Sequence, residues 1–80
     1  MIEQGLDDAA RGVESLPALL VWVGAPRLRR LGYAVPPGPP LPEHRLYEVL
    51  SQQDPDAAHS RYNALVRRLA SFARAAACAP

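Results

Sequence analysis

Apolar side chains recur every three or four positions along most of this chain, which is the spacing of a helix and not of a strand. Ile2 and Leu6 begin such a pattern, and the charged Glu3, Asp7 and Arg11 fall on the other side of the predicted helix. The spacing predicts a first helix over residues 2–14. Gly5 and Gly12 each weaken this helix by about 1 kcal/mol relative to alanine, so it needs support from tertiary contacts.

An almost continuous apolar run follows and predicts a second helix over residues 16–23. Ser15 is suited to cap its N-terminus, and Pro17 fits its first turn, where a missing N–H has no cost. Residues 19–23 are also short and apolar enough for a buried strand, which periodicity alone does not exclude. No partner strand is evident elsewhere in the sequence, so we expect a helix that ends at Gly24.

Two short helices flank a proline-rich connector in the next part of the chain. The first is predicted over residues 26–31 and closed by Gly32, and the second over residues 43–53. The connector between them, residues 33–42, contains five prolines. Each proline fixes its own φ and biases the preceding residue toward extended backbone. The connector is therefore expected to be stiff and to cross the surface.

The clearest local signal precedes the last helix, which is predicted over residues 55–77. Asp54 is a good N-cap, Pro55 suits the first helical position, and the acidic Asp56 suits the first turn. At 1.5 Å per residue this helix is a rod of about 34 Å, so one end projects unless the other helices lie along its full length. Its apolar positions fall within a single arc: Ala58, Tyr62, Leu65, Val66, Leu69, Phe72, Ala73 and Ala76.

Together these elements predict an all-α fold: a small bundle of four or five short helices with a long C-terminal helix, in a single domain over residues 1–80. Apolar residues make up 49% of the chain, but 14 residues are alanine, so the core is expected to be thin. A compact chain of this length has a radius of gyration of about 12 Å.

The cysteine content and the longest apolar run indicate the cellular compartment in which the protein acts. Cys78 is the only cysteine, so no disulfide can form within the chain, and we expect a reducing, cytoplasmic setting. The first residues lack the basic and apolar segments of a signal peptide. The longest apolar run has eleven residues, whereas a bilayer span takes about 20, so no membrane association is expected.

Charge is segregated along the chain. All nine basic residues are arginine, which, with the abundant alanine and proline, favours a bacterial or phage origin. Residues 1–26 contain four acidic residues and one arginine, whereas residues 27–80 contain eight arginines and four acidic residues. The acidic first part and the basic remainder can attract each other, within one chain or across a homodimer.

The sequence contains no recognisable catalytic, metal-binding or cofactor-binding constellation. His44 and Glu48 are four residues apart, as are His59 and Asn63, a spacing that commonly just supports a helix. Cys78 has no histidine near it in the sequence and is interpreted as an inert thiol. A metal site needs three or four ligands at fixed spacings, and phosphate binding needs a glycine-rich loop. The chain is therefore expected to be neither an enzyme nor a cofactor carrier.

A cluster of arginines suggests nucleic-acid binding as an alternative function. Arg27, Arg29 and Arg30 follow Gly24 in the outline of a degenerate helix-turn-helix. Gly32 shortens the helix that would read the bases, which favours a solvated basic turn instead. On the last helix, Arg67 and Arg74 point away from the apolar arc and could follow phosphates. Arg61 and Arg68 flank the arc, and we expect them to contact a partner protein. Alternatively, they could form ion pairs with the acidic first helix.

Three aromatic residues complete the set of candidates. Trp22, Tyr33 and Tyr47 are core residues or, where two are exposed together, anchors of an interface. The thin core, the long amphipathic helix and the segregated charge favour a small non-enzymatic interaction module. Such a regulator, adaptor or inhibitor would present a helical face to another protein or to a second copy of itself.

Overall fold

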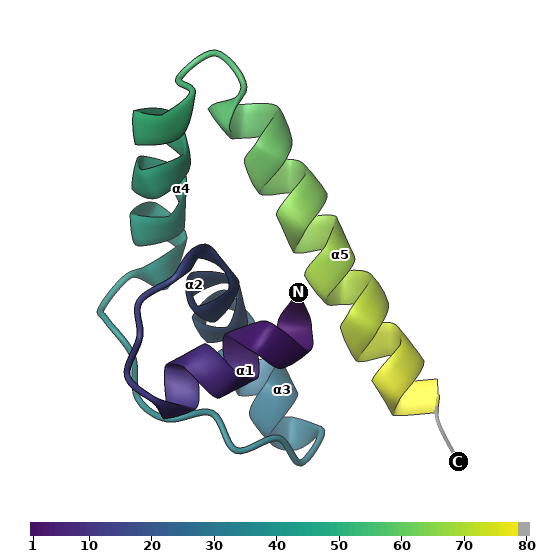
Figure 1. The fold of residues 1–80 in the computed structure, drawn as a ribbon. Coiled ribbons are helices and arrows are strands. Elements are labelled where there is room, and N and C mark those ends of the chain that lie inside the picture. Colours follow the sequence, from purple (N-terminus) through teal and green to yellow (C-terminus); the bar gives the residue numbers. More distant parts are fainter. Residues whose placement is uncertain (79–80) are drawn as a thin grey trace.

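The computed structural model describes residues 1–78, and this range contains five helices (Figure 1). No strand is present in that range, which confirms the predicted all-α fold. The radius of gyration is 12.3 Å, as expected for a compact chain. The helices are α1 (Ile2–Ala10), α2 (Leu16–Val23), α3 (Ala25–Arg30), α4 (Pro42–Gln53) and α5 (Ala58–Cys78).

The apolar run forms helix α2, which lies at the centre of the molecule. Leu19, Leu20 and Val21 are each at most 1% exposed, because α1, α4 and α5 pack around α2 on different sides. A helix that is covered on several sides needs apolar residues around most of its circumference, which explains why the run shows no polar face. The choice between helix and strand at residues 19–23 is thereby settled as helix.

Helix α1 packs closely on α2 because of one glycine. A Cβ atom at Gly5 would lie 2.3 Å from the carbonyl oxygen of Pro17 and 2.6 Å from a methyl group of Val21. Only a residue without a side chain allows the two backbones to approach this closely. The glycine that weakens α1 as an isolated helix is therefore the residue that lets α1 dock.

The junction between α1 and α2 holds the only buried charged side chain of residues 1–78, Asp8. Its carboxylate accepts hydrogen bonds from Ser15 Oγ at 2.7 Å and from Arg11 Nη2 at 2.8 Å. Ser15 Oγ in turn accepts a hydrogen bond from the backbone N–H of Ala18 at 3.2 Å, which confirms the predicted N-cap of α2. The cap of α2 is thus tied to α1.

The predicted end of the first helix is wrong. Helix α1 stops at Ala10 and not at residue 14, because Gly12 adopts a left-handed backbone with φ of 73°. The N–H of Val13 bonds to the carbonyl of Asp8, and that of Gly12 bonds to the carbonyl of Ala9, which is the Schellman pattern. The same pattern, with Gly32 at φ 99°, ends α3 as predicted.

The predicted start of the last helix is also displaced. The Asp54 carboxylate accepts a hydrogen bond from the N–H of Asp56 at 3.2 Å, as the expected cap would. A backbone hydrogen bond from the N–H of Ala57 to the carbonyl of Asp54, at 3.2 Å, closes a separate turn over residues 55–57. Helix α5 therefore begins three residues later than expected, at Ala58. The other boundaries, at α3 and α4, differ from the prediction by one residue, which is within the ordinary uncertainty of helix ends.

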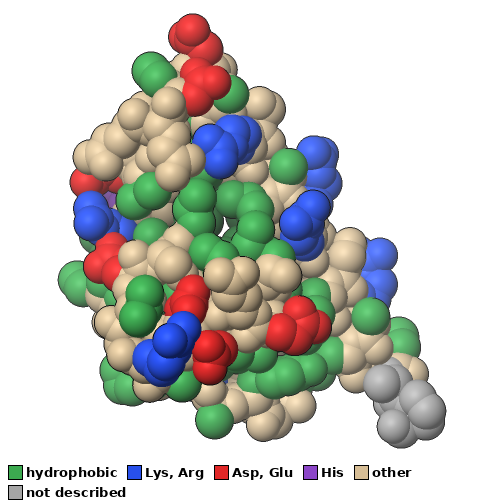
Figure 2. Space-filling model, viewed as in Figure 1, with side chains coloured by type: hydrophobic (Ala, Val, Ile, Leu, Met, Phe, Trp, Pro, Cys, Tyr) green, Lys and Arg blue, Asp and Glu red, His purple; other side chains and the backbone are tan. Residues whose placement is uncertain are grey.

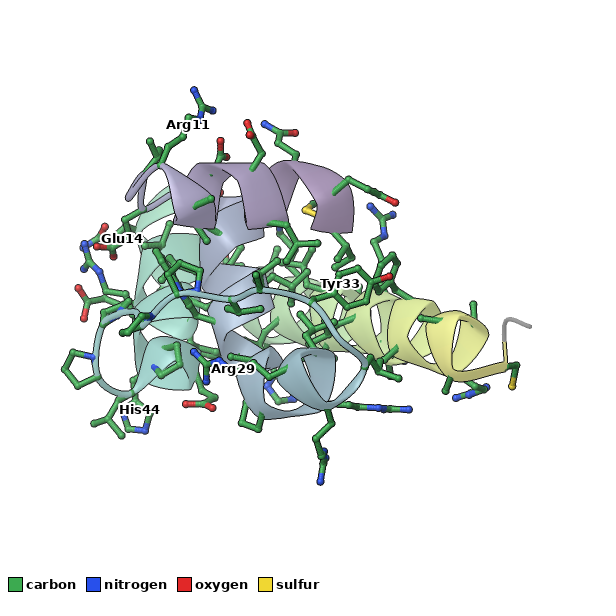
Figure 3. The ribbon with its side chains drawn as sticks, turned by 90° about the horizontal axis from the view of Figure 1, so that it is seen from below. Arg11, Glu14, Arg29, Tyr33 and His44 are labelled. Carbon is green, nitrogen blue, oxygen red and sulfur yellow. The ribbon has the colours of Figure 1, made fainter. Side chains whose placement is uncertain are left out.

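Helix α5 is paired with α4 at its N-terminal end and diverges from it along its length (Figure 1). All eight predicted apolar-arc residues are buried or half-buried, so the predicted face is confirmed. The C-terminal end of α5 extends past the other helices, as Figure 3 shows from below. Hydrophobic side chains line a hollow where α4 and α5 separate above α1 (Figure 2).

The connector between α3 and α4 runs along the lower edge of the view in Figure 1 and is fixed at several points. Trp22 Nε1 donates a hydrogen bond to the carbonyl of Pro36 at 3.0 Å, and Arg29 Nε donates one to the carbonyl of Val35 at 3.0 Å. Gly38 lies directly on the indole ring, since a Cβ there would be 2.6 Å from it. The connector is therefore packed against the core.

Candidate partner-binding surface

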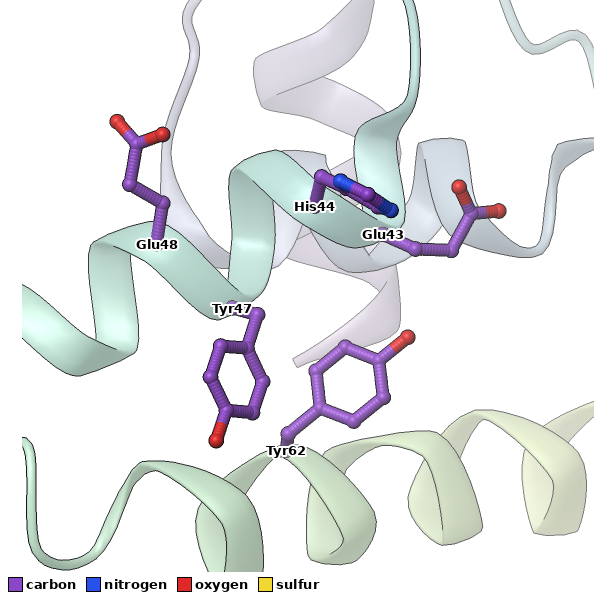
Figure 4. A pocket seen from close by; sticks show the side chains of 5 residues that line it. All are labelled: Glu43, His44, Tyr47, Glu48 and Tyr62. Atoms are coloured by element: carbon purple, nitrogen blue, oxygen red, sulfur yellow. The ribbon is translucent and has the colours of Figure 1, made fainter.

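The exposed aromatic site lies between α4 and α5, where Tyr47 and Tyr62 meet (Figure 4). Their ring centroids are 5.7 Å apart, with planes at 61°, which is the edge-to-face arrangement that aromatic pairs favour. Tyr47 is 38% exposed and Tyr62 is half-buried. The rings form one wall of an open cavity of about 510 Å³, and the rest is lined by Glu43, His44 and Glu48. We call this site the Tyr47–Tyr62 pocket.

Helical periodicity explains why these side chains share a surface. Glu43 and Tyr47 are four residues apart on α4, so they lie in one row along the helix, beside the buried Leu46 and Leu50. Tyr62 comes from the first turns of α5, and its hydroxyl is directed toward Glu43 (Figure 4). The pocket therefore depends on the pairing of α4 with α5.

The electrostatics of the pocket are acidic. Burial and the nearby Glu43 carboxylate raise the pKa of Tyr62 above its ordinary value. Burial and the Glu43 charge both disfavour a negative charge on the Tyr62 hydroxyl, and burial is the larger cause. No arginine lines the pocket.

Glu48 is bound differently from the predicted pairing with His44. It accepts a hydrogen bond from Arg45 Nη1 at 2.9 Å, and Arg45 also donates through Nε to Glu14. These bonds raise the pKa of Arg45, with the Glu14 hydrogen bond as the largest cause. The ion pairs connect α4 to the segment between α1 and α2, and they leave His44 at the rim of the pocket.

Two of the three aromatic candidates are core residues. Trp22 is 8% exposed and bonds to the connector, so it is not an exposed interface anchor. Tyr33 is half-buried and packs on Phe72 of α5, with ring centroids 5.7 Å apart. Tyr47 alone is exposed as the interface hypothesis requires, and its neighbour is Tyr62.

The basic cluster at α3 does not have helix-turn-helix geometry. A single residue, Gly24, separates α2 from α3, whereas that motif has a turn of about three or four residues. Helix α3 is six residues long, and the Arg29 guanidinium is bonded to the connector, including the Pro36 carbonyl at 3.3 Å. Arg27 and Arg30 remain exposed and form no ion pair within residues 1–78.

The arginines of α5 are all exposed, and Figure 2 shows arginine side chains along this helix. Arg61 donates a hydrogen bond to Gln53 Oε1 at 3.0 Å, at the turn between α4 and α5. Arg61 and Arg68 form no ion pair with the acidic α1 inside the described chain, because α1 packs on α2. Arg67 and Arg74 lie on the side of α5 turned away from the core.

The remaining candidates form no reactive group. Asn63 Nδ2 and His59 Nε2 are 3.3 Å apart on the exposed side of α5, and Cys78 is exposed at its end. Within residues 1–78, no three histidine, cysteine or acidic side chains gather closely enough to hold a metal ion. None of the helices in this range combines the length and apolar character needed to cross a bilayer.

Sequence reasoning does not identify Glu43 and Tyr62 as members of the site. The helical pattern places Tyr62 in the buried arc and Glu43 only at the start of a helix. One available signal is the amphipathic nature of tyrosine. When its ring is half-buried at the edge of a core, its hydroxyl must reach a polar group or solvent.

Comparison of the chain with protein-family models, curated proteins and solved structures found no match.

Proposed function

We propose that the protein is a small non-enzymatic interaction module that binds another protein through the surface formed by α4 and α5. One observation carries the proposal. Tyr47 is an exposed aromatic residue on a rigid helix, beside a second tyrosine and an open cavity of about 510 Å³. Aromatic side chains in such pockets are the residues that most often dominate binding energy.

Further support comes from the size of the molecule and the projecting end of α5. The described chain measures 40 × 24 × 19 Å along its principal axes, and much of its long helix is only half-covered. The single cysteine favours a reducing, cytoplasmic setting. A regulator, adaptor or inhibitor of this size would act by occupying a surface of its partner.

Site-specific photo-cross-linking tests the proposal. A photoreactive benzoylphenylalanine at His44, on the rim of the pocket, should give a discrete protein adduct in the cells that express the chain. The same group at Gln4, which is exposed on α1 and outside the proposed surface, is the matched control and should give none. Adducts at Gln4 alone, or at neither position, would contradict the proposed surface. An adduct of twice the monomer mass would identify a homodimer.

Nucleic-acid binding remains a second candidate, favoured by the exposed arginines that form no ion pair within residues 1–78. Arg27, Arg30, Arg67 and Arg74 could bind phosphates, since each such interaction releases counterions and strengthens binding at low salt. Fluorescence anisotropy with labelled DNA and RNA over a salt series would test it. Substituting these arginines by alanine should lower the salt slope by about one for every arginine that binds a phosphate. An unchanged slope would exclude the mechanism.

A further inference from the structure

The Tyr47–Tyr62 pocket contains an acidic group that has no partner. Glu43 forms no ion pair and no side-chain hydrogen bond within residues 1–78. It lies one helical turn before Tyr47, and the Tyr62 hydroxyl points toward it (Figure 4). A free carboxylate is therefore placed beside two aromatic rings.

The arginines nearest to this pocket are bonded elsewhere. Arg29 lines the neighbouring cavity that Glu43 also borders, and its guanidinium donates to two carbonyls of the connector. The nearest arginine in the α4 sequence, Arg45, lies on a different flank of the helix from Tyr47, because residues two apart are about 200° apart on a helix. It is already paired with Glu14 and Glu48. No basic group other than the His44 ring lines the pocket. The face of an aromatic ring is itself negative, so rings and carboxylate favour the same sign of charge.

We propose that the Tyr47–Tyr62 pocket binds the guanidinium group of an arginine side chain carried by a partner protein. A guanidinium is planar, so it can lie against the exposed face of Tyr47 while its N–H groups donate to the Glu43 carboxylate. A lysine ammonium has no planar surface to stack on the ring, so it should bind less tightly than a guanidinium. The inference rests on the proposed function and specifies the chemistry of the partner.

The test uses the smallest ligand that carries the group. N-acetyl-arginine methylamide is titrated into isotopically labelled full-length protein and followed by NMR. The resonances of Tyr47, Tyr62 and Glu43 should shift together, with a dissociation constant on the order of millimolar. The citrulline analogue has the same shape without the charge and should bind at least about tenfold more weakly. The lysine analogue should also bind more weakly than the arginine ligand.

Matched variants link the binding to the pocket. Glu43→Gln keeps the shape of the side chain, removes its charge and should weaken binding about tenfold. Glu3→Gln removes the same charge from α1, where Glu3 is highly exposed, and should leave binding unchanged. Circular dichroism of both variants shows that the helices are retained. Tyr47→Leu keeps an apolar side chain there and should also weaken binding.

Several results would overturn the inference. Equal affinity for the citrulline or lysine ligand would show that the pocket does not recognise a guanidinium. Unchanged binding by Glu43→Gln would show that the Glu43 carboxylate does not take part. Shifts confined to the acidic α1 would place the binding elsewhere. Concentration-dependent shifts of the pocket without ligand would identify a second copy of the chain as the occupant. An adduct at His44 without arginine binding would refute this inference alone, whereas arginine binding without any adduct would refute the proposed function.

Discussion

The replacement of Gly5 by alanine is the sharpest test of the packing between α1 and α2. Helix propensity alone predicts that Gly5→Ala stabilises the protein by about 1 kcal/mol, because glycine is a poor helix former. The structure predicts the opposite sign. The new Cβ would lie 2.3 Å from the Pro17 carbonyl oxygen and 2.6 Å from a methyl group of Val21.

The magnitude follows from the displacement that the methyl group requires. Ordinary Cβ contacts lie at 3.4–4 Å, so α1 must move about 1 Å away from α2 to accept the new group. The contact at 2.3 Å is with backbone, which cannot rotate away as a side chain can. Overpacking costs about 1–3 kcal/mol and can cost more, and a clash with backbone belongs in the upper part of this range, at about 2–3 kcal/mol, which exceeds the gain in helix propensity. We expect a net decrease of about 1–2 kcal/mol in the free energy of unfolding.

Thermal unfolding followed by circular dichroism measures this decrease. For a domain of this size, 1 kcal/mol corresponds to about 4–8 °C in Tm, so Gly5→Ala should lower Tm by about 5–15 °C. Gly24→Ala is the control, because the three atoms nearest to its Cβ, at 2.6–3.1 Å, all belong to the Leu69 side chain, which can rotate where backbone cannot. It should be tolerated better than Gly5→Ala. A Tm for Gly5→Ala equal to or above that of the native protein would refute the packing argument.

Three further predictions concern the connector and the pocket. Leu41 is 64% exposed with φ of 50°, so Leu41→Asn, which tolerates this backbone, should raise the free energy of unfolding by about 1 kcal/mol; a lower value in chemical denaturation would contradict the strain. The raised pKa of Tyr62 means that the folded state holds its proton more tightly than the unfolded state. The stabilisation from this pKa difference is fully present below the unfolded pKa of about 10 and is lost as the pH rises through the folded pKa. In denaturation experiments at pH 9–11, the free energy of unfolding of Tyr62→Phe should therefore fall less than that of the native protein. An equal fall would exclude the linkage. Arg29→Ala removes two hydrogen bonds to the connector and should make Trp22, which the connector covers, more accessible to quenching of its fluorescence by acrylamide, with unchanged quenching as the contrary result.

Features governed by a single short segment are predictable from the sequence. Ser15 caps α2 and Gly32 ends α3 as expected, because a cap depends on a few neighbouring residues and their backbone angles. The apolar arc of α5 is likewise a property of one helix. Gly12 shows the limit of such reasoning. The helical pattern makes it a weak position inside a helix, whereas it adopts a left-handed backbone and terminates α1.

Features that depend on two segments are not predictable in this way. The role of Gly5 requires the backbone of Pro17 at a short distance, which no local pattern indicates. The pocket escapes prediction for the same reason, since Glu43 and Tyr62 are on different helices and meet only when α4 pairs with α5. Trp22 is a plausible interface anchor by sequence because its sequence neighbourhood does not reveal that the connector covers it.

Because the connector lies on Trp22, the fluorescence of this residue reports whether the connector is in place. This residue is the only tryptophan, so emission excited at wavelengths that the three tyrosines do not absorb comes from one known position. Its indole is buried and bonded to the Pro36 carbonyl, while the helices contribute independently to the far-ultraviolet spectrum. A red shift of the emission without loss of helical signal would therefore reveal a state in which the connector has lifted away and the bundle persists. Detachment of one surface segment can be distinguished from unfolding in an unlabelled sample.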